Sequence, residues 1–164
     1  MADVKSSINP LFLREEELRQ GIELLFYGYR DFTGEPDSIL AEVGFGRAHH
    51  RAIHFINRDP GMTVAALLAI LRITKQSLSR VLSQLVEEGY VEQKKGVRDR
   101  RQRLLYLTEK GRELERRVSE KQRARVAKAY QEAGAEAVEG YRKVLLGLID
   151  ETDRATVLKS IQNR

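Results

Sequence analysis

The chain has 164 residues, of which 41% are hydrophobic and 32% charged, so it can form one domain with a real core and a highly solvated surface. It contains no cysteine, which excludes disulfides, thiolate metal sites and thiol-based redox sensing. No apolar run reaches the length of a membrane span, and the first ten residues lack the layout of a signal peptide; we therefore expect a cytoplasmic protein with no membrane partner.

The N-terminal part of the chain predicts helices separated by breaks. Apolar residues recur at helical spacing over residues 11–33, which predicts a long amphipathic helix. The glycine and proline of Thr33–Asp37 then predict a break. Further along we expect a short helix, a second break, a longer helix and a turn, in that order, at Ser38–Val43, Gly44–Gly46, Arg47–Asn57 and Arg58–Gly61.

Two short helices with marked starts come next. Thr63 is a suitable N-cap for a helix over residues 63–71, and Thr74 for a second helix that ends before Gly89. Only a few residues join them, which is the layout of a helix-turn-helix. The inward stripe of the second helix is predicted at Leu78, Val81, Leu82, Leu85 and Val86. Its other face carries side chains that can bond to phosphates and base edges: Lys75, Gln76, Ser77, Ser79, Arg80 and Ser83.

A strongly basic hairpin follows this helix. Residues 90–94 and 103–107 are predicted to be its two strands. The stretch from Lys94 to Arg103 holds six Lys and Arg residues and one Asp, a charge of +5 that equals the formal charge of the whole chain. Charge this local indicates a site that meets a polyanion, since loops that are merely solvated usually mix their charges.

The C-terminal part is predicted to be helical. Thr108 can cap a long charged helix over residues 109–130, and shorter helices are expected at Tyr141–Asp150 and Asp153–Ile161. Neither end of the chain has an obvious core of its own, and long helices depend on burial of a face. We therefore expect the terminal helices to pack together and against a second copy in a two-fold symmetric homodimer.

Residues Asp99–Gly111, DRRQRLLYLTEKG, resemble the wing motif D-x-R-x-x-x-L-x-L-T-x-x-G of the multiple-antibiotic-resistance regulator (MarR) family. The run from Ser79 to Tyr90, with Glu87, Gly89 and Tyr90 near its end, is similar to the recognition helix of that family. The resemblance implies a mainly α fold with a small β wing: a winged helix-turn-helix with N- and C-terminal dimerisation helices. It assigns residues 38–108 to DNA binding, and residues 11–35 and 109–164 to dimerisation.

The implied function is a homodimeric regulator of transcription, often a repressor, that binds double-stranded DNA at a pseudo-palindromic operator. Residues 74–88 would enter the major groove and residues 91–107 the minor groove. In the wing, the resemblance implies that Asp99 holds the Arg101 side chain for insertion; the alternative is that both residues only stabilise the loop. The candidate DNA contacts comprise the polar residues of the recognition helix given above and six residues of the wing: Lys94, Lys95, Arg98, Asp99, Arg100 and Arg101.

In this family a small-molecule effector commonly lowers DNA affinity by binding between the dimerisation helices and the DNA-binding module. The candidates here are Phe12, Phe26, Tyr29, Phe32 and His50, which could equally form the dimer core. We expect no metal site, although His50 and His54 have i, i+4 spacing, because no cysteine or H-E-x-x-H motif accompanies them.

We expect no cofactor and no enzymatic activity, since no acid–base pair is placed beside a nucleophile. A non-specific architectural DNA-binding protein is the alternative function, because it would need the basic wing but no base-reading helix.

Overall fold

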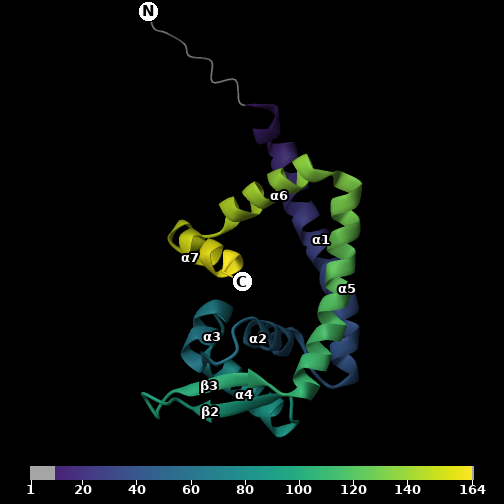
Figure 1. Ribbon diagram of the computed structural model, residues 1–164. Coiled ribbons are helices and arrows are strands. Elements are labelled where there is room, and N and C mark those ends of the chain that lie inside the picture. The colour runs from purple at the N-terminus through teal and green to yellow at the C-terminus, as the bar shows by residue number, and fades with distance from the viewer. Residues whose placement is uncertain (1–9, 164) are drawn as a thin grey trace, which may run out of the picture. The chain divides into compact units, whose positions relative to one another are not determined.

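The computed structural model describes residues 10–163, which form a mainly helical chain with one small antiparallel sheet (Figure 1). The chain divides into two compact units after Gln122, inside a long helix. None of the helices in the described residues combines the length and the apolarity that a membrane crossing requires. In order, the elements are η1 (Leu11–Leu13), α1 (Glu15–Glu42), α2 (Arg47–Arg58), β1 (Met62–Thr63), α3 (Val64–Leu71), α4 (Lys75–Glu87), β2 (Val91–Lys95), β3 (Arg103–Leu107), α5 (Glu109–Ala133), α6 (Ala135–Leu148) and α7 (Glu151–Gln162).

The predicted break at Thr33–Asp37 is wrong, because α1 passes through it without interruption. The separate helix predicted at Ser38–Val43 is the end of α1. A proline inside a helix costs about 3 kcal/mol. Here Pro36 is buried together with Thr33 and Leu40, and the Thr33 hydroxyl donates to two carbonyls of the preceding turn at 2.9 and 3.1 Å. Burial of this face outweighs the hydrogen bond that proline cannot make.

The central helices agree with the sequence. Helix α2 covers the predicted stretch, and α3 and α4 form the predicted helix-turn-helix. Three residues join α3 to α4, and the first, Arg72, has the left-handed φ of 51°. At the start of α3 the Thr63 hydroxyl accepts a hydrogen bond from the Ala66 N–H at 3.1 Å, which confirms the predicted cap.

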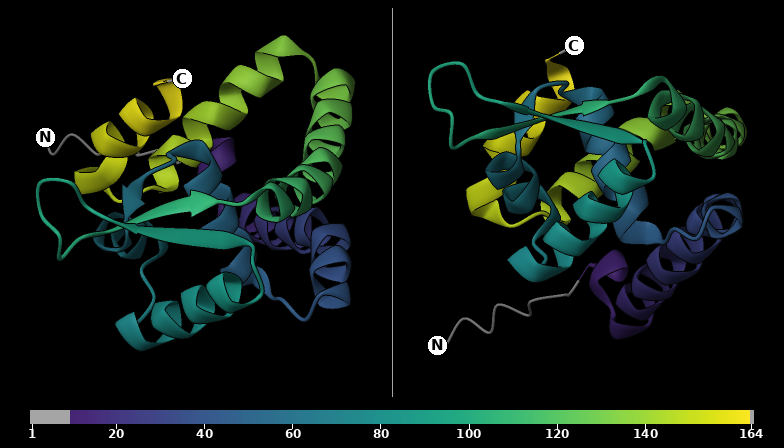
Figure 2. Two further views of the ribbon diagram at one scale, coloured as in Figure 1. Left: turned by 60° about the horizontal axis from the view of Figure 1, so that its bottom comes forward. Right: turned by 90° about the horizontal axis from the view of Figure 1, so that it is seen from below.

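The hairpin strands are confirmed, and a third strand joins them. Strand β1 pairs with β3 so that Met62 lies opposite Leu105, and β2 pairs with the other edge of β3 so that Val91 lies opposite Leu107. The order is therefore β1-β3-β2. Two residues are too few to show a period of two, so the sequence did not predict β1. In Figure 2 the hairpin of β2 and β3 ends in a loop that extends beyond helices α3 and α4 of the same unit.

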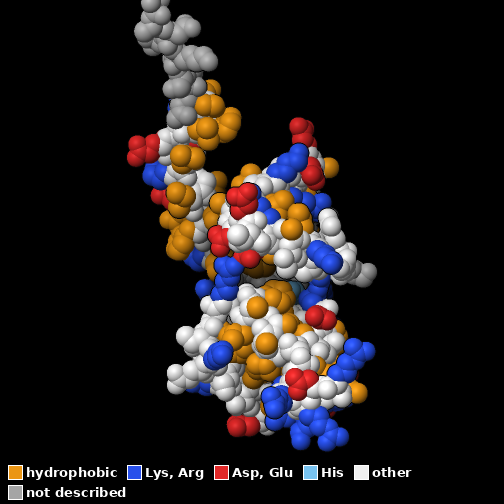
Figure 3. All heavy atoms as spheres, turned by 90° about the vertical axis from the view of Figure 1, so that its left-hand side faces the viewer, with side chains coloured by type: hydrophobic (Ala, Val, Ile, Leu, Met, Phe, Trp, Pro, Cys, Tyr) orange, Lys and Arg blue, Asp and Glu red, His pale blue; other side chains and the backbone are white. Residues whose placement is uncertain are grey.

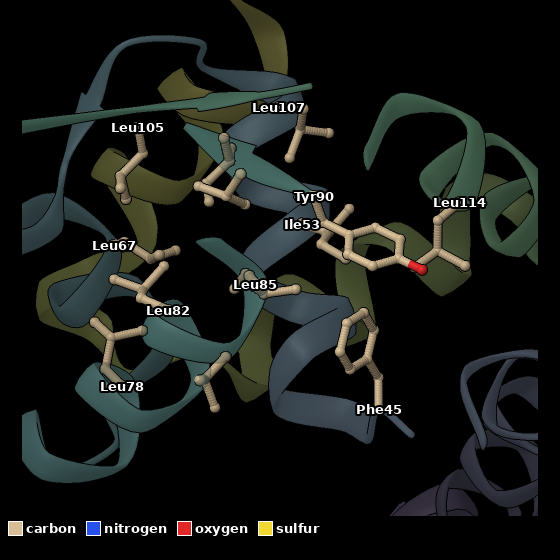
Figure 4. Close-up of a cluster of buried hydrophobic side chains, with 14 of the residues drawn as sticks. Phe45, Ile53, Leu67, Leu78, Leu82, Leu85, Tyr90, Leu105, Leu107 and Leu114 are labelled. Atoms are coloured by element: carbon tan, nitrogen blue, oxygen red, sulfur yellow. The ribbon is translucent and has the colours of Figure 1, made fainter. Parts of the chain in front are cut away.

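The core of the first unit lies between the sheet and helices α2, α3 and α4. Figure 4 shows part of this buried cluster, in which Ile53, Leu67, Leu85 and Leu105 are each at most 1% exposed. Burial of each such side chain contributes about 1.5–3 kcal/mol. Val86, which was predicted to face inward, is 37% exposed and lies at the margin of the stripe.

The start of α5 is fixed to the hairpin and to the end of α4. The Thr108 hydroxyl donates to the Gly89 carbonyl at 2.6 Å and accepts from the Gly111 N–H at 3.1 Å. The Lys110 ammonium donates to the Glu88 carbonyl at 2.9 Å. A Cβ at Gly111 would lie 2.1 Å from the Tyr90 carbonyl oxygen, so only glycine allows α5 to approach this closely.

The second unit contains the rest of α5 with α6 and α7. Helix α6 begins at Ala135 rather than at the predicted Tyr141, because the alanines and glutamates before Tyr141 favour a helix more than Gly140 opposes it. Helix α7 begins at Glu151 rather than at the predicted Asp153, with Asp150 at its N-cap position. The Arg154 guanidinium donates to two carbonyls at the end of α6, each at 2.9 Å, and so holds the two helices together.

Candidate nucleic-acid interface

Helix α4 is fixed at both ends. The Thr74 hydroxyl accepts a hydrogen bond from the Ser77 N–H at 3.1 Å and donates to the Ser77 hydroxyl at 2.8 Å. At the other end Gly89 has a φ of +80°, and the Tyr90 N–H donates to the Leu85 carbonyl at 2.8 Å. With its ends and its buried stripe held, α4 presents its outer face in one orientation.

The outer face of α4 carries all six polar residues that the sequence proposed as contacts. Successive helical residues are turned by about 100°, which places Gln76, Arg80 and Ser83 opposite the buried leucines. All three are exposed, and among the described residues the Arg80 guanidinium has no hydrogen-bond or ion-pair partner. Ser77 is also exposed, but its hydroxyl belongs to the helix cap. Lys75 and Ser79 complete the exposed set.

An open groove joins α4 to the base of the hairpin. Its volume is about 470 Å³, and it lies between α3, α4 and strand β2. Gln93 of β2 contributes to the same wall as Lys75, Ser79 and Ser83 of α4. The helix and the hairpin therefore form one continuous surface rather than two separate ones. The apolar lining residues are Val64, Ala65, Leu68, Leu78 and Leu82.

The loop of the hairpin, residues 96–102, is closed by hydrogen bonds. We call β2, this loop and β3 the wing. The Gly96 N–H donates to the Gln102 carbonyl at 3.0 Å, and the Gln102 N–H donates to the Asp99 carbonyl at 3.1 Å. A Cβ at Gly96 would lie 2.4 Å from that Asp99 carbonyl oxygen. The backbone of Gly96 therefore approaches the backbone of Asp99 so closely that only glycine fits.

The Asp99 carboxylate contacts the Arg101 backbone rather than its guanidinium. The Arg101 N–H donates to Asp99 Oδ1 at 2.9 Å, a turn in which a side chain replaces a backbone acceptor. This contact matches the alternative in which Asp99 stabilises the loop. It leaves the Arg101 side chain exposed and, among the described residues, without an ion-pair partner.

The cations of the wing lack the ion pairs that Arg116 of α5 makes. On α5 the guanidinium of Arg116 is paired with both Glu113 and Glu120, at 2.8 and 3.2 Å. Within residues 10–163, no ion pair neutralises the six cations between Lys94 and Arg103. The Lys94 ammonium lies 4.9 Å from the centre of the Tyr106 ring, which holds its stem against the sheet. In Figure 3 Lys and Arg side chains gather at the lower edge, where the hairpin lies. The positive field of the wing is therefore available to an external polyanion.

A pocket of about 250 Å³ lies between α1, α2 and α5. The structure brings together three of the five candidate effector residues in its wall, namely Tyr29, Phe32 and His50. Phe12 and Phe26 are not part of the wall and are 71% and 64% exposed. Residues that the sequence did not indicate complete the lining: Thr33, Asp37, Arg47, Arg51, His54, Phe55 and Gln122.

Polar contacts fix the pocket walls. The Arg47 guanidinium donates to Asp37 Oδ2 at 3.0 Å and to the Thr33 hydroxyl at 3.2 Å, and Arg51 donates to the Tyr29 hydroxyl at 2.7 Å. Burial lowers the pKa of His50 below its ordinary value of 6.5, and the neighbouring His54 lowers it further. No group of three side chains in the described residues could hold a metal ion.

His49 has a structural contact that sequence reasoning missed. Its Nδ1 accepts a hydrogen bond from the Gly46 N–H at 3.1 Å, so the ring proton is on Nε2, which donates to Gln84 Oε1 at 2.8 Å. This bond connects α2 to α4 across 35 positions of sequence. The sequence carries no local signal that indicates a contact between His49 and Gln84.

Known proteins are similar to this chain in sequence and in fold. A family model described as MarR family matches residues 43–102. The HTH-type transcriptional regulator PetP of Rhodobacter capsulatus is 56% identical over 144 residues, which cover 88% of this chain and 87% of that protein. The structure of Streptococcus pneumoniae FabT in complex with DNA has a TM-score of 0.72 at 22% identity and covers 88% of this chain and 99% of FabT.

A mutant MarR from E. coli complexed with operator DNA gives a TM-score of 0.64 at 19% identity, with coverage of 85% of this chain and 99% of that one. At these identities the structural likenesses show the winged helix-turn-helix fold. The identity to PetP over most of both chains shows more than the fold: this chain belongs to the MarR family of transcription regulators.

Proposed function

We propose that the chain is a homodimeric, sequence-specific DNA-binding repressor of transcription. The observation that carries this proposal is the continuous surface on which an exposed polar helix adjoins a closed loop with unneutralised cations. A helix of this kind fits the major groove, where base edges offer distinct hydrogen-bond patterns. The basic loop fits the adjacent minor groove, where negative potential is concentrated.

Two features of the outer face of α4 support base reading. Arg80 and Gln76 lie on the side opposite the core and have the donor geometry for guanine and adenine, respectively. The helix start at Thr74 is capped, so the N-terminal half that enters the groove in helix-turn-helix proteins is well ordered. FabT and the E. coli MarR, which share this fold, were both solved with DNA.

Arg101 is our candidate for minor-groove insertion. The Asp99 carboxylate holds the Arg101 backbone, and the guanidinium is left free to enter a groove. Arg101→Ala should weaken operator binding by more than about 1 kcal/mol. Arg101→Lys is the matched control, because it keeps the charge but loses the planar fork. If the lysine variant binds as tightly as the wild type, Arg101 acts as a charge only.

Selection of bound duplexes from a random pool, followed by titration with selected and random DNA, tests the proposal directly. We expect a pseudo-palindrome with half-sites about one helical turn apart. Equal affinities for selected and random DNA would instead favour a non-specific architectural function, which the concentration of charge in the wing could serve on its own.

An apolar stripe on α1 supports the dimer. Leu18, Ile22, Leu25 and Tyr29 continue the helix face that is buried at Thr33–Leu40, yet they are between 42% and 70% exposed. Figure 3 shows hydrophobic side chains along α1 below the grey residues. Exposed apolar surface of this extent marks an interaction site, and an identical stripe on a second copy would cover it.

Ile22→Lys should dissociate the dimer, because a charge would be buried without a partner. Leu24→Lys is the control: Leu24 is 72% exposed, close to the 70% of Ile22, but lies on another face of α1. Mass measured by light scattering during size-exclusion chromatography distinguishes them. A monomeric wild type, or equal effects of both variants, would contradict this interface.

We further propose that a small-molecule effector binds the pocket between α1 and α2 and lowers DNA affinity. Aromatic walls at Tyr29 and Phe32, with His50 and two arginines, suit a small ligand that is partly apolar. The test is a compound screen for release of operator DNA. Compounds that release the wild type but not His50→Ala would support the pocket, and compounds that release both equally would place the effector elsewhere.

A further inference from the structure

One residue of the basic loop, Val97, has a large apolar side chain. Val97 is 95% exposed, more than any other large hydrophobic residue that the structure describes. It lies between Gly96 and Arg98, and two further arginines, Arg100 and Arg101, follow within the same loop. Because its side chain has almost no contact within the loop, Val97 is available to contact a partner.

The loop holds Val97 in a defined position. Gly96 is buried, and its backbone lies so near that of Asp99 that an added Cβ would be 2.4 Å from the Asp99 carbonyl oxygen. The hydrogen bonds from Gly96 to Gln102 and from Gln102 to Asp99 fix the return path. Because the loop is already ordered, little conformational entropy is lost when Val97 meets a surface.

The surface that complements this loop has anionic edges and a centre that an apolar group can touch. The minor groove of DNA has these properties: phosphates line its edges, and its floor differs between base pairs. An A·T pair offers only acceptors and leaves the centre of the floor open. A G·C pair adds the guanine 2-amino group, which projects into the groove at the centre.

An exposed valine in this loop can occupy the open floor of an A·T pair, whereas at a G·C pair its methyl groups meet the 2-amino group. They cannot accept the hydrogen bond that this group makes to water, so the donor is left unsatisfied. On the basis of the DNA-binding function proposed above, we propose that Val97 makes the wing select A·T pairs by excluding the guanine 2-amino group. Val97 thereby adds sequence selectivity to a loop whose other contacts are electrostatic.

Base analogues that change only the minor groove test this step. In the selected operator, the pairs contacted by the wing are those whose adenine N3 atoms, which lie in the minor groove, the bound protein protects from methylation. Replacing A·T by G·C there should lower wild-type affinity about tenfold, the usual scale of one unfavourable pair. An inosine·C pair, which lacks the 2-amino group, should restore the affinity. A diaminopurine·T pair, which adds that group to an A·T-like pair, should lower the affinity again.

Val97→Thr is the matched variant, since threonine has the same shape and its hydroxyl can accept the amino hydrogen. It should bind A·T and G·C operators within about twofold of each other, because a hydroxyl can serve either pair. The position is exposed, so the variant should fold as the wild type does, which circular dichroism can verify. Arg98→Ala should weaken all operators to a similar degree and keep the selectivity.

The outcomes separate this inference from the proposed function. If the wild type prefers no DNA sequence, the proposed function fails. If the wild type binds an operator but Val97→Thr keeps the full G·C penalty, or inosine·C binds as poorly as G·C, the role of Val97 is overturned and DNA binding stands. An operator whose affinity does not depend on Arg101 would also overturn it, because the wing would then have no minor-groove contact.

Discussion

Replacement of Gly111 by alanine tests how the DNA-binding module is joined to α5. On helix propensity alone, Gly→Ala inside a helix should stabilise by about 0.5–1 kcal/mol. The contact predicts the opposite sign, because the new Cβ would lie 2.1 Å from the Tyr90 carbonyl oxygen and 3.4 Å from Leu107 Cβ. The first of these is a backbone atom, which cannot move aside as a flexible side chain could.

Overpacking of this kind costs about 1–3 kcal/mol, and a clash with the backbone belongs near the upper end. After the gain in propensity is subtracted, we expect Gly111→Ala to lower the free energy of unfolding by about 2 kcal/mol. For a chain of this size that corresponds to a melting temperature lower by about 4–8 °C.

The matched control is Gly34→Ala, at an exposed position inside α1 where a new Cβ would meet nothing within 4 Å. This variant should be stabilised by about 0.5–1 kcal/mol. Thermal unfolding at one fixed protein concentration provides both values, because the stability of the proposed dimer would depend on concentration. If Gly111→Ala were as stable as Gly34→Ala, the close approach of α5 to Tyr90 would not be what requires glycine.

Three further predictions concern charge, pH and capping. Lys94→Ala and Lys95→Ala should each reduce the slope of log affinity against log salt by about one unit, measured by fluorescence anisotropy, and an unchanged slope would exclude a phosphate contact. Burial lowers the pKa of His50 in the folded protein. The nearby His54 and Arg51 also disfavour its charged form, whereas Glu115 and Asp37 favour it. Because the net effect is a lower pKa, protonation of His50 favours unfolding. Stability should fall as pH drops below 6.5 towards the folded pKa, and urea titrations of His50→Gln should show a smaller fall. Thr108→Val loses the cap of α5 and the bond to Gly89, and chemical denaturation should show a loss of about 1–2 kcal/mol; no loss would mean that water replaces both bonds.

The features that could be predicted from the sequence are those with local causes. The caps at Thr63 and Thr74, and the end of α4 at Gly89, depend on residues within one turn, so each could be inferred from its neighbours. Helix α1 differs, because its continuity through Pro36 depends on burial of one face. Strand β1 exists only because Leu105, more than forty positions later, supplies its hydrogen-bond partners.

The candidate site divides in the same way. The composition of the wing indicated a polyanion contact, because charge can be counted without coordinates. Residue spacing could not tell whether the Asp99 carboxylate would meet the amide or the guanidinium of Arg101, since both lie within reach. The bond between His49 and Gln84 required two helices to be placed side by side, and no pattern in either helix indicates the other.

The contacts around Thr108 constrain how a regulator of this construction can respond to a ligand. The end of α4, the start of β2 and the first turn of α5 meet there. The Thr108 hydroxyl donates to the Gly89 carbonyl, and the Lys110 ammonium donates to the Glu88 carbonyl. Gly111 also lies close to the Tyr90 carbonyl. Such a junction has no room for one element to shift alone, because packed cores respond in discrete steps rather than by continuous deformation. Helix α4 and the wing must therefore move together with the first turns of α5. If the proposed effector binds the pocket between α1 and α2, it would act by changing where this rigid module is held. That change would alter the spacing of the two copies of the proposed dimer on DNA, and it would not unfold the surface proposed to meet the operator.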